Sequence, residues 1–247
     1  MNIDQLKLGK LQAEHDDRTI KLSAILNKTL PPIPAVYDFD QQHPGCDMPM
    51  FLNDQLGDCV IAGRAHMTRR FELIEQSKVI KITDAEVKKE YFKESGGQDS
   101  GLNMLDALNA WRKGWKAAGK TYNVDAFASV KASSNYMVSA CIALLSGCYV
   151  GVARPLSAQK QVGKVWTITT GASARPGTWG GHCIYLVAYN LTGPICITWG
   201  ARQQMTWAWL AKYCDEAFGV VDNRDSWLTK ATIDVPKMEG MLKEITA

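Results

Sequence analysis

The chain has 247 residues, 46% of them hydrophobic and 21% charged, a composition that suits a folded domain with a sizeable core and excludes a disordered or fibrous protein. The net charge of +3 arises from 28 basic and 25 acidic residues. These are interspersed along the chain, so no basic stripe points to nucleic acid or to an anionic membrane surface as a partner.

The first 33 residues are predicted to form an N-terminal arm. They are mostly polar and lack the apolar core of a secretory signal, so we expect a soluble protein made in the cytoplasm, free or as part of a virion or other assembly. Pro31, Pro32 and Pro34 keep the next segment extended and exclude a helix there. Such an arm is expected to contact another surface, either a second copy of the chain or an assembly partner, rather than to fold as a unit of its own.

Residues 34–247 are predicted to form the domain, which begins with a helical half over about 59–147. The first helix is expected at Cys59, because apolar side chains follow at helical spacing and Asp58 is placed to cap the first turn. A second helix is expected at Thr83, since the stretch TDAE has the form of a capping box.

Two further helices are predicted in this half. An apolar stripe with steps of four, three and four residues joins Met104, Leu108, Trp111 and Trp115. The apolar stretch YMVSACIALLSG, residues 136–147, then predicts a buried helix that closes at Gly147.

A strand-rich half is predicted over about 148–234. The stretches CYVGVARP, HCIYLVAYN and PICITWG are short, apolar and rich in β-branched and aromatic residues, as strands are. A glycine-rich loop, residues 169–181, delivers the chain to His182 at the head of the second of these strands. Residues 206–218, TWAWLAKYCDEAF, indicate a further helix. Helices followed by strands place the chain in the α+β class.

Cys59 and His182 are the candidate catalytic pair. A cysteine in the first turn of a helix lies at the positive end of the helix dipole, which favours the thiolate. An imidazole can take the thiol proton, and Gln55 can donate a side-chain N–H to the oxyanion of an attacked carbonyl. His66 is excluded as the base, because two helical turns place it about 10 Å from Cys59 along the axis.

Each of these residues also has a structural interpretation. Cys59 fits a small buried residue on a helix, and His182 fits a core histidine at a strand edge. Gln55 fits a loop residue that bonds the backbone.

The order of these residues resembles that of the papain-like cysteine peptidases. PAVYDFD (34–40) is similar to the entry of the mature domain, DQLGDCVIA (54–62) to the loop from glutamine to cysteine, and GGHCIYLVAYN (180–190) to the Gly-His strand. Residues 96–114 and 141–155 resemble the family's Gly-Gly loop with its helix and the helix and strand before the histidine. The 123 residues from cysteine to histidine are compatible with the family spacing of about 130 or more.

The resemblance implies a papain-like two-lobed fold with a mainly antiparallel β lobe, and a thiol hydrolase that acts on a peptide or amide. Cys59 would be the nucleophile and His182 the base and then the acid, while Gln55 and the Cys59 backbone N–H would hold the oxyanion. No cofactor or metal is implied, and the partner would be a peptide or protein substrate.

The segment ITWG (197–200) is similar to the one that carries the family's asparagine and its shielding tryptophan. Ile197 or Thr198 takes the asparagine's place. Thr198, which lies 16 residues after His182, is the better candidate, because its hydroxyl can hydrogen-bond and an isoleucine side chain cannot.

The sequence also departs from the family pattern. The loop between Gln55 and Cys59 is short, the charge of Asp58 opposes a thiolate, and the asparagine is missing. The 33 residues before the entry are fewer than the family's long inhibitory pro-segment. Two hypotheses follow: a weak or divergent cysteine peptidase, and an impaired papain-like scaffold that serves as a structural or interaction component of an assembly such as a phage virion.

The cysteine pattern bears on redox state and metals. The number of cysteines is odd and no C-x-x-C pair occurs, which argues against a disulfide framework and against a zinc site. Most are expected to be buried thiols: Cys46, Cys59, Cys141, Cys148, Cys183, Cys196 and Cys214.

Overall fold

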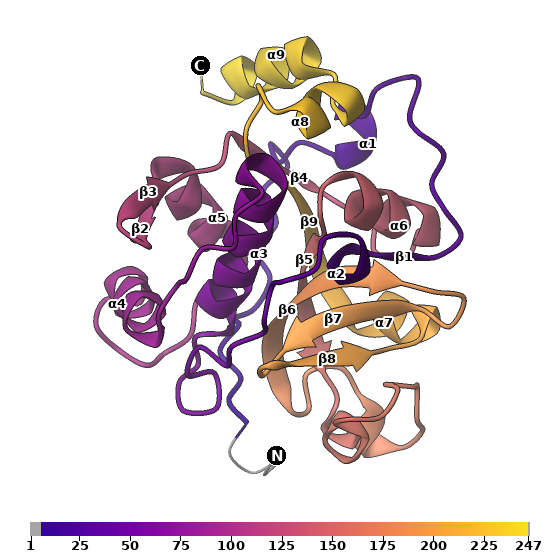
Figure 1. Cartoon of the computed structure of the whole chain (residues 1–247). Helices are drawn as coiled ribbons and strands as arrows, with labels where there is room; N and C mark the ends of the chain where they lie inside the picture. The colour runs from indigo at the N-terminus through magenta and orange to yellow at the C-terminus, as the bar shows by residue number, and fades with distance from the viewer. Residues whose placement is uncertain (1–5, 247) are drawn as a thin grey trace.

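A mostly antiparallel sheet forms the centre of the protein, whose structure is a computed structural model that describes residues 6–246 (Figure 1). The main sheet has seven strands within this range, in the order β4-β9-β5-β6-β7-β8, with β1 added against β6. A separate hairpin is made by β2 and β3. The strands are β1 (Tyr37–Asp38), β2 (Trp115–Ala117), β3 (Lys120–Tyr122), β4 (Ala126–Ser129), β5 (Cys148–Arg154), β6 (Gly180–Tyr189), β7 (Pro194–Thr198), β8 (Ala201–Gln204) and β9 (Cys214–Val221).

The helices pack on both faces of this sheet. Helices α3, α4 and α5 gather on one side, and α1, α8 and α9 lie together at one end of the molecule (Figure 1). Among the residues described, no helix is long and apolar enough to cross a membrane. The helices are α1 (Leu22–Ile25), α2 (Phe39–Gln42), α3 (Cys59–Gln76), α4 (Asp84–Glu94), α5 (Met104–Lys113), α6 (Asn135–Leu144), α7 (Trp207–Tyr213), α8 (Trp227–Thr232) and α9 (Val235–Thr246).

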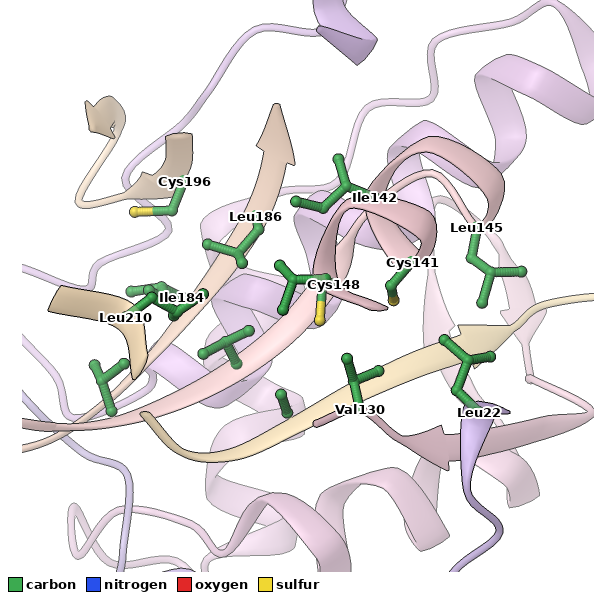
Figure 2. Close-up of a cluster of buried hydrophobic side chains, with 14 of the residues drawn as sticks. Leu22, Val130, Cys141, Ile142, Leu145, Cys148, Ile184, Leu186, Cys196 and Leu210 are labelled. Carbon is green, nitrogen blue, oxygen red and sulfur yellow. The ribbon is translucent and has the colours of Figure 1, made fainter. Parts of the chain in front are cut away.

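Each face of the sheet carries its own hydrophobic core. Along β6, Cys183 and Tyr185 belong to the core under α3 and α5, whereas Ile184 and Leu186 belong to the core under α1, α6 and α7. Figure 2 shows the second core, in which Ile142 of α6 lies over Leu186. Because both faces of β6 are buried, a slip of one residue would exchange the two sets of side chains, and the strand register is therefore strongly determined.

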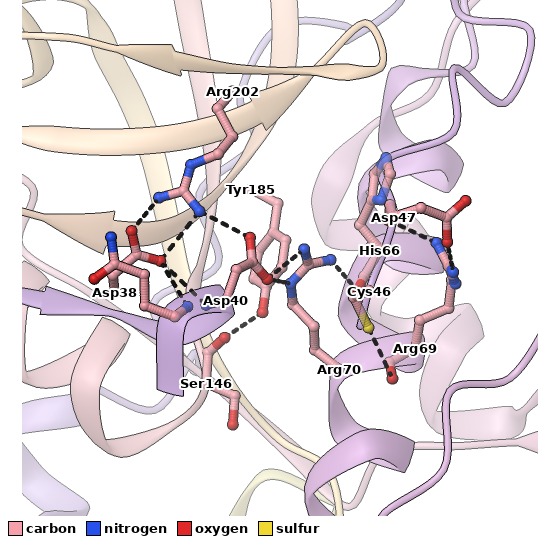
Figure 3. A network of polar contacts seen from close by, with 11 residues as sticks. Asp38, Asp40, Cys46, Asp47, His66, Arg69, Arg70, Ser146, Tyr185 and Arg202 are labelled. Atoms are coloured by element: carbon pink, nitrogen blue, oxygen red, sulfur yellow. Dashed lines mark hydrogen bonds and ion pairs between the residues drawn. The ribbon is translucent and has the colours of Figure 1, made fainter. Parts of the chain in front are cut away.

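A network of arginine and aspartate side chains joins α3 to the sheet (Figure 3). Arg70 of α3 donates to Oδ1 of Asp40 from Nε and Nη2, at 3.0 and 2.7 Å. Arg202 of β8 donates to the other oxygen of Asp40 at 3.0 Å and to Asp38 at 2.7 Å. Because Arg70 is fully buried, its charge needs these partners, and they hold α3 in a defined place against the sheet.

The predicted class and order of elements are confirmed: a helical half precedes mainly antiparallel strands. The capping box is present, since the Thr83 side chain accepts from the Glu86 amide and the Glu86 carboxylate accepts from the Thr83 amide. The strands expected around residues 148–154, 182–190 and 194–200 are β5, β6 and β7.

Two element boundaries predicted from the sequence are wrong. Helix α5 ends at Lys113, because Gly114 adopts a φ of +100° that breaks the helix, and the buried Trp115 begins β2 instead. Helix α7 ends at Tyr213, and the residues after it form β9, which pairs with both β4 and β5. Pairing in the middle of a sheet overrides the local helical pattern there.

The described part of the N-terminal arm, residues 6–33, lies against the same chain. Isolated bridges join Lys10 to Leu102 and Lys21 to Ser129. The predicted contact with a second copy or an assembly partner stays a prediction, and residues 1–5 of the arm lie outside the described residues.

Candidate active site

Cys59 is the first residue of α3, which at 18 residues is the longest helix described. Its side chain is only 2% exposed, and its Sγ accepts a hydrogen bond from the Cys183 amide of β6 at 3.3 Å. Burial raises the pKa of the Cys59 thiol to about 11, although the backbone amides of Cys183 and Gly9 act in the opposite direction. In this closed arrangement Cys59 is a protonated thiol at neutral pH.

Asp58 precedes the helix but does not cap it as the sequence suggested. It is the N-cap residue, yet its side chain accepts no capping hydrogen bond, and its backbone, with φ −97° and ψ 14°, lacks the extended conformation typical of a capping residue. Burial raises its pKa to about 8. The carboxyl group is therefore mostly neutral at pH 7, and the expected repulsion between Asp58 and a thiolate is largely removed at that pH.

His182 lies on β6 and bonds Thr198. Its Nε2 is 2.7 Å from the Thr198 Oγ1, and the imidazole is fully buried. Burial, followed by the charge of Arg154, holds the pKa of His182 well below its ordinary value. The imidazole is consequently neutral at rest. When Nε2 carries the proton, Nε2–H donates a hydrogen bond to the Thr198 hydroxyl, and the Nδ1 lone pair is available as a base.

Strand register explains why Thr198, and not Ile197, meets the imidazole. Tyr185 pairs with Ile197 across β6 and β7, and residues directly opposite each other share a face of the sheet. Ile197 therefore packs with Tyr185 in the core under α3. Thr198 projects to the opposite face, which also carries His182, since alternate residues of a strand face the same way.

Trp199 shields the histidine. Thr198 pairs with Ala201, so Trp199 and Gly200 form a two-residue turn, with φ values of +47° and +69°. Two positive φ values are typical of the tight hairpin turns that match strand twist. This turn stacks the Trp199 indole on the His182 ring at a centroid distance of 4.4 Å and an angle of 18°.

The Cys59 thiol contacts β6 one residue beyond His182, but no hydrogen bond joins the thiol to the imidazole. Cys59 Sγ contacts β6 at the amide of Cys183, the residue that follows His182. Within residues 6–246, the Nδ1 of His182 has no hydrogen-bond partner. Catalytic hydrogen bonds are often loose in resting enzymes and tighten with substrate bound, so this arrangement is compatible with a catalytic pair at rest.

Gln55 lies on the turn before α3. Its side chain is exposed, while its backbone amide bonds the Leu52 carbonyl at 2.7 Å. The oxyanion role that the resemblance implies for Gln55 stays a prediction.

A hydrogen-bond network aligns the two loops beside Cys59. Oδ1 of Asp99 accepts from the Gly57 amide at 2.9 Å and from the Tyr91 hydroxyl at 2.6 Å. The Tyr91 oxygen in turn accepts from the Gly101 amide at 2.9 Å. The loop before the cysteine and the loop around residues 96–102 are thus held at a set spacing.

The N-terminal arm runs between these two loops and β6. Gly9 accepts from the Leu102 amide at 2.8 Å, and the Lys10 amide donates to the Gly181 carbonyl at 3.1 Å. Upstream, the Trp199 indole donates to the Lys7 carbonyl at 3.1 Å. The arm therefore crosses directly over Cys59 and reaches the tryptophan that covers His182.

The arm fits there because the chain backbones meet at glycines. A Cβ on Gly9 would lie 1.7 Å from the Gly57 carbonyl oxygen, so only glycine allows this approach. Sequence reasoning identified the arm but not its position over the site. The glycines at 57, 101 and 181 lie far apart in the sequence, but a Cβ on any of them would meet the backbone of the arm at 3.1 Å or less.

Arg154, at the end of β5, was also missed. Its guanidinium lies 4.0, 4.4 and 4.6 Å from the ring centroids of Trp166, Trp179 and Trp199. It is fully buried, and none of its side-chain nitrogens is hydrogen-bonded among the described residues. Burial lowers its pKa to about 9. An arginine that ends an otherwise apolar strand was the one sequence signal for it.

Replacing Asp58 by asparagine is expected to raise the melting temperature at pH 9 and to leave it nearly unchanged at pH 4. The folded pKa of about 8 lies above the ordinary 3.8, so the folded state binds a proton that the unfolded chain releases. Stability from this group is fully present below about pH 3.8 and is lost as pH rises through about 8.

Thermal melts at the two pH values measure this effect, and each kcal/mol shifts the melting temperature by about 2–4 °C in a chain of this size. Asn at the exposed Asp17 serves as the control and should change neither melt. An equal shift for Asp58→Asn at pH 4 and pH 9 would show that its carboxyl is not titrating as described.

Comparisons with known proteins bear on the class of this fold. No protein-family model matches the sequence, and no curated protein matches it. Among solved structures, xylellain, a cysteine protease from Xylella fastidiosa, is similar with a TM-score of 0.67 and 15% identity, over 89% of this chain and 97% of that one.

Two other solved structures extend the comparison. Procathepsin L 3 of the Tenebrio molitor larval midgut has a TM-score of 0.62 at 8% identity, over 89% of this chain and 77% of that one. The Carica candamarcensis cysteine protease CMS1MS2, in complex with E-64, has a TM-score of 0.57 at 13% identity, over 77% of this chain and 100% of that one. The chain has the papain-like cysteine protease fold, and the resemblance noted in the sequence is confirmed at the level of fold.

Proposed function

We propose that the protein is a papain-like cysteine peptidase or amide hydrolase that is latent while its N-terminal arm covers Cys59. The observation that carries this proposal is the His182–Thr198 hydrogen bond under Trp199, set beside a cysteine at the start of the longest helix. A cysteine near an imidazole that a third group orients is the kind of arrangement that thiol catalysis uses.

The reaction proceeds through a thioester. With substrate in place of the arm, Nδ1 of His182 takes the thiol proton as Cys59 Sγ bonds to the carbonyl carbon. The carbonyl electrons move onto oxygen, which the Cys59 backbone N–H and Gln55 stabilise. The imidazolium then protonates the leaving amine as the C–N bond breaks, and water hydrolyses the thioester in a second round of the same proton transfers.

Thr198 acts as a positioning residue in this scheme. Its hydroxyl accepts from Nε2–H and so keeps the lone pair on Nδ1. A hydroxyl can also donate, which would stabilise the tautomer that cannot act as a base. Thr198 is therefore a weaker orienter than an asparagine carbonyl, and the expected turnover is low.

A second candidate function is a papain-like scaffold that serves as a structural or interaction component of an assembly such as a virion. Two observations favour the scaffold. His182 Nδ1 has no hydrogen-bond partner among the described residues, and Cys59 is deeply buried. In that case neither residue has a chemical role.

Hydrolysis of a mixed peptide library by a full-length Gly9→Ala variant distinguishes the two. This substitution forces the arm away from Gly57 and should expose Cys59. We expect slow hydrolysis that Cys59→Ala abolishes and that His182→Ala lowers by about 100-fold, the effect of a lost general base. No hydrolysis in Gly9→Ala, together with a Cys59 reactivity that His182→Ala leaves unchanged, would establish the scaffold.

A further inference from the structure

Lys10 of the arm sends its side chain into a closed slot beside the candidate site. The side chain is fully buried, and its Nζ lies 2.9 Å from Oε1 of Glu216 and 3.0 Å from Oδ2 of Asp215. Burial lowers the pKa of Lys10, but the two carboxylates outweigh it and the net pKa is raised. The slot therefore holds a charged ammonium group and compensates its charge.

The slot is shaped by β5 and β9. Gly151 of β5 forms one wall, where a Cβ would lie 2.2 Å from Cε of Lys10 and 2.6 Å from Cγ of Glu216. A side chain at position 151 would fill this space. A long unbranched side chain is thus accommodated only because residue 151 is glycine.

The acidic end of the slot has acceptor capacity that Lys10 leaves unused. Oε2 of Glu216 and Oδ1 of Asp215 are buried and make no hydrogen bond among residues 6–246. The side chain of Glu216 is 3% exposed, and that of Asp215 is 30% exposed. A planar guanidinium, with five N–H donors, could reach oxygens that a single ammonium does not.

The backbone around Lys10 is bound as a peptide ligand would be. Leu102 donates to the Gly9 carbonyl and accepts from the Leu11 amide, at 2.8 and 2.9 Å, and Gly181 accepts from the Lys10 amide. The backbone amide of Gly9 hydrogen-bonds to the Cys59 thiol. The arm is consequently held across the site with an N–H group directed at the sulfur.

We propose that the slot between Gly151 and Glu216 is a specificity pocket for a basic side chain, and that Lys10 occupies it in place of a substrate's lysine or arginine. This inference rests on the proposed peptidase function, and it names the substrate class: peptides with a basic residue close to the cleaved bond. Such a substrate competes with the arm for the same hydrogen-bond partners and the same carboxylates.

A binding test that needs no catalysis uses full-length Lys10→Ala, in which the slot is emptied. n-Propylammonium, which matches the lost atoms from Cγ to Nζ, should raise its melting temperature by several degrees and saturably, at constant ionic strength. It should not stabilise the wild-type chain or Lys10→Ala/Glu216→Gln, and n-propanol should stabilise none of them. An equal response of all three proteins, or no response of Lys10→Ala, would overturn the pocket.

A substrate test uses two peptides that are identical except for one position, which is arginine in one and norleucine in the other, and a Gly9→Ala/Lys10→Ala chain in which the arm is displaced from Cys59. This chain should cleave the arginine peptide with a kcat/KM at least tenfold higher than that for the norleucine peptide, and Glu216→Gln in the same background should remove the preference. Should Lys10→Ala not fold, Lys10→Met keeps the slot filled without charge, and the same peptides are compared in it with and without Glu216→Gln.

The two hypotheses fail separately. Stabilisation by n-propylammonium that depends on Glu216, with no peptide cleaved by the chain whose arm is displaced, would support the pocket and reject the peptidase. Cleavage of both peptides at equal rates, whatever residue stands at 216, would support the peptidase and overturn the pocket.

Discussion

Alkylation of Cys59 by iodoacetamide at pH 7 is expected to become about 100-fold faster in Gly9→Ala than in the wild-type chain. An added Cβ at Gly9 would meet the Gly57 carbonyl at 1.7 Å, so the arm must leave its path over the thiol. Water then reaches a side chain that was 2% exposed. Its pKa should fall from about 11 toward the ordinary 9.0, and two pH units change the thiolate fraction about 100-fold.

Mass spectrometry of the labelled peptides, taken over time, separates Cys59 from the other six cysteines. Gly240→Ala is the matched control, because a Cβ at Gly240 meets nothing within 4 Å and the residue lies in α9, whose contact with the arm is to α1. It should leave the Cys59 rate at the wild-type value. A Gly9→Ala rate equal to that of Gly240→Ala would mean that the arm does not protect the thiol.

The pH dependence of labelling gives an independent check on the same arm. In the wild-type chain the rate should keep rising up to about pH 11, because burial favours the neutral thiol. In Gly9→Ala the midpoint should move to lower pH, since hydration stabilises the thiolate. Midpoints that coincide would show that the raised pKa of Cys59 has a source other than the arm.

Thr198→Asn is expected to raise peptide hydrolysis by about tenfold in the Gly9→Ala background, and Thr198→Val to lower it by about as much. The hydroxyl of Thr198 lies 2.7 Å from Nε2 of His182 and can either accept or donate. An asparagine carbonyl only accepts, so it holds the proton on Nε2 and the lone pair on Nδ1. Valine has the same shape as threonine but cannot orient the ring, and loss of an orienting group costs catalysis heavily.

The rates are measured with one peptide substrate across the pH range, together with the melting temperature of each variant. A positioning role predicts that Thr198→Val lowers kcat far more than it changes KM, while the folded protein persists. A lower rate that follows only from a lower melting temperature would point to packing instead. Unchanged hydrolysis in both variants would show that another residue orients His182.

Local sequence patterns predict many of the helices and strands without any knowledge of tertiary contacts. The TDAE capping box depends on hydrogen bonds within a single turn, and it is present at Thr83. Strands β5, β6 and β7 were recognisable because burial on both faces demands apolar and β-branched residues throughout. The boundary at Trp115 was missed because a helical stripe of side chains continues past Gly114, whose backbone conformation a periodicity does not reveal.

The candidate site divides in the same way. By its residue types and their order, the sequence determined Cys59, His182 and the choice between Ile197 and Thr198. The sequence favoured Thr198 for its hydroxyl and its spacing, and the strand register of β6 and β7 shows that Thr198 faces His182, because the face to which a side chain points depends on pairing between segments.

The burial of Lys10 against Glu216, 206 positions away, and of Arg154 among three tryptophans could be decided only by the tertiary structure. Apart from the hydrogen bond from Lys10 Nζ to the adjacent Leu11 carbonyl, the groups around each of these two side chains come from distant parts of the chain, which folding alone brings together. A sequence pattern reflects interactions between residues that are near one another along the chain. The path of the arm past distant glycines depends on packing between separate segments, which such a pattern does not predict.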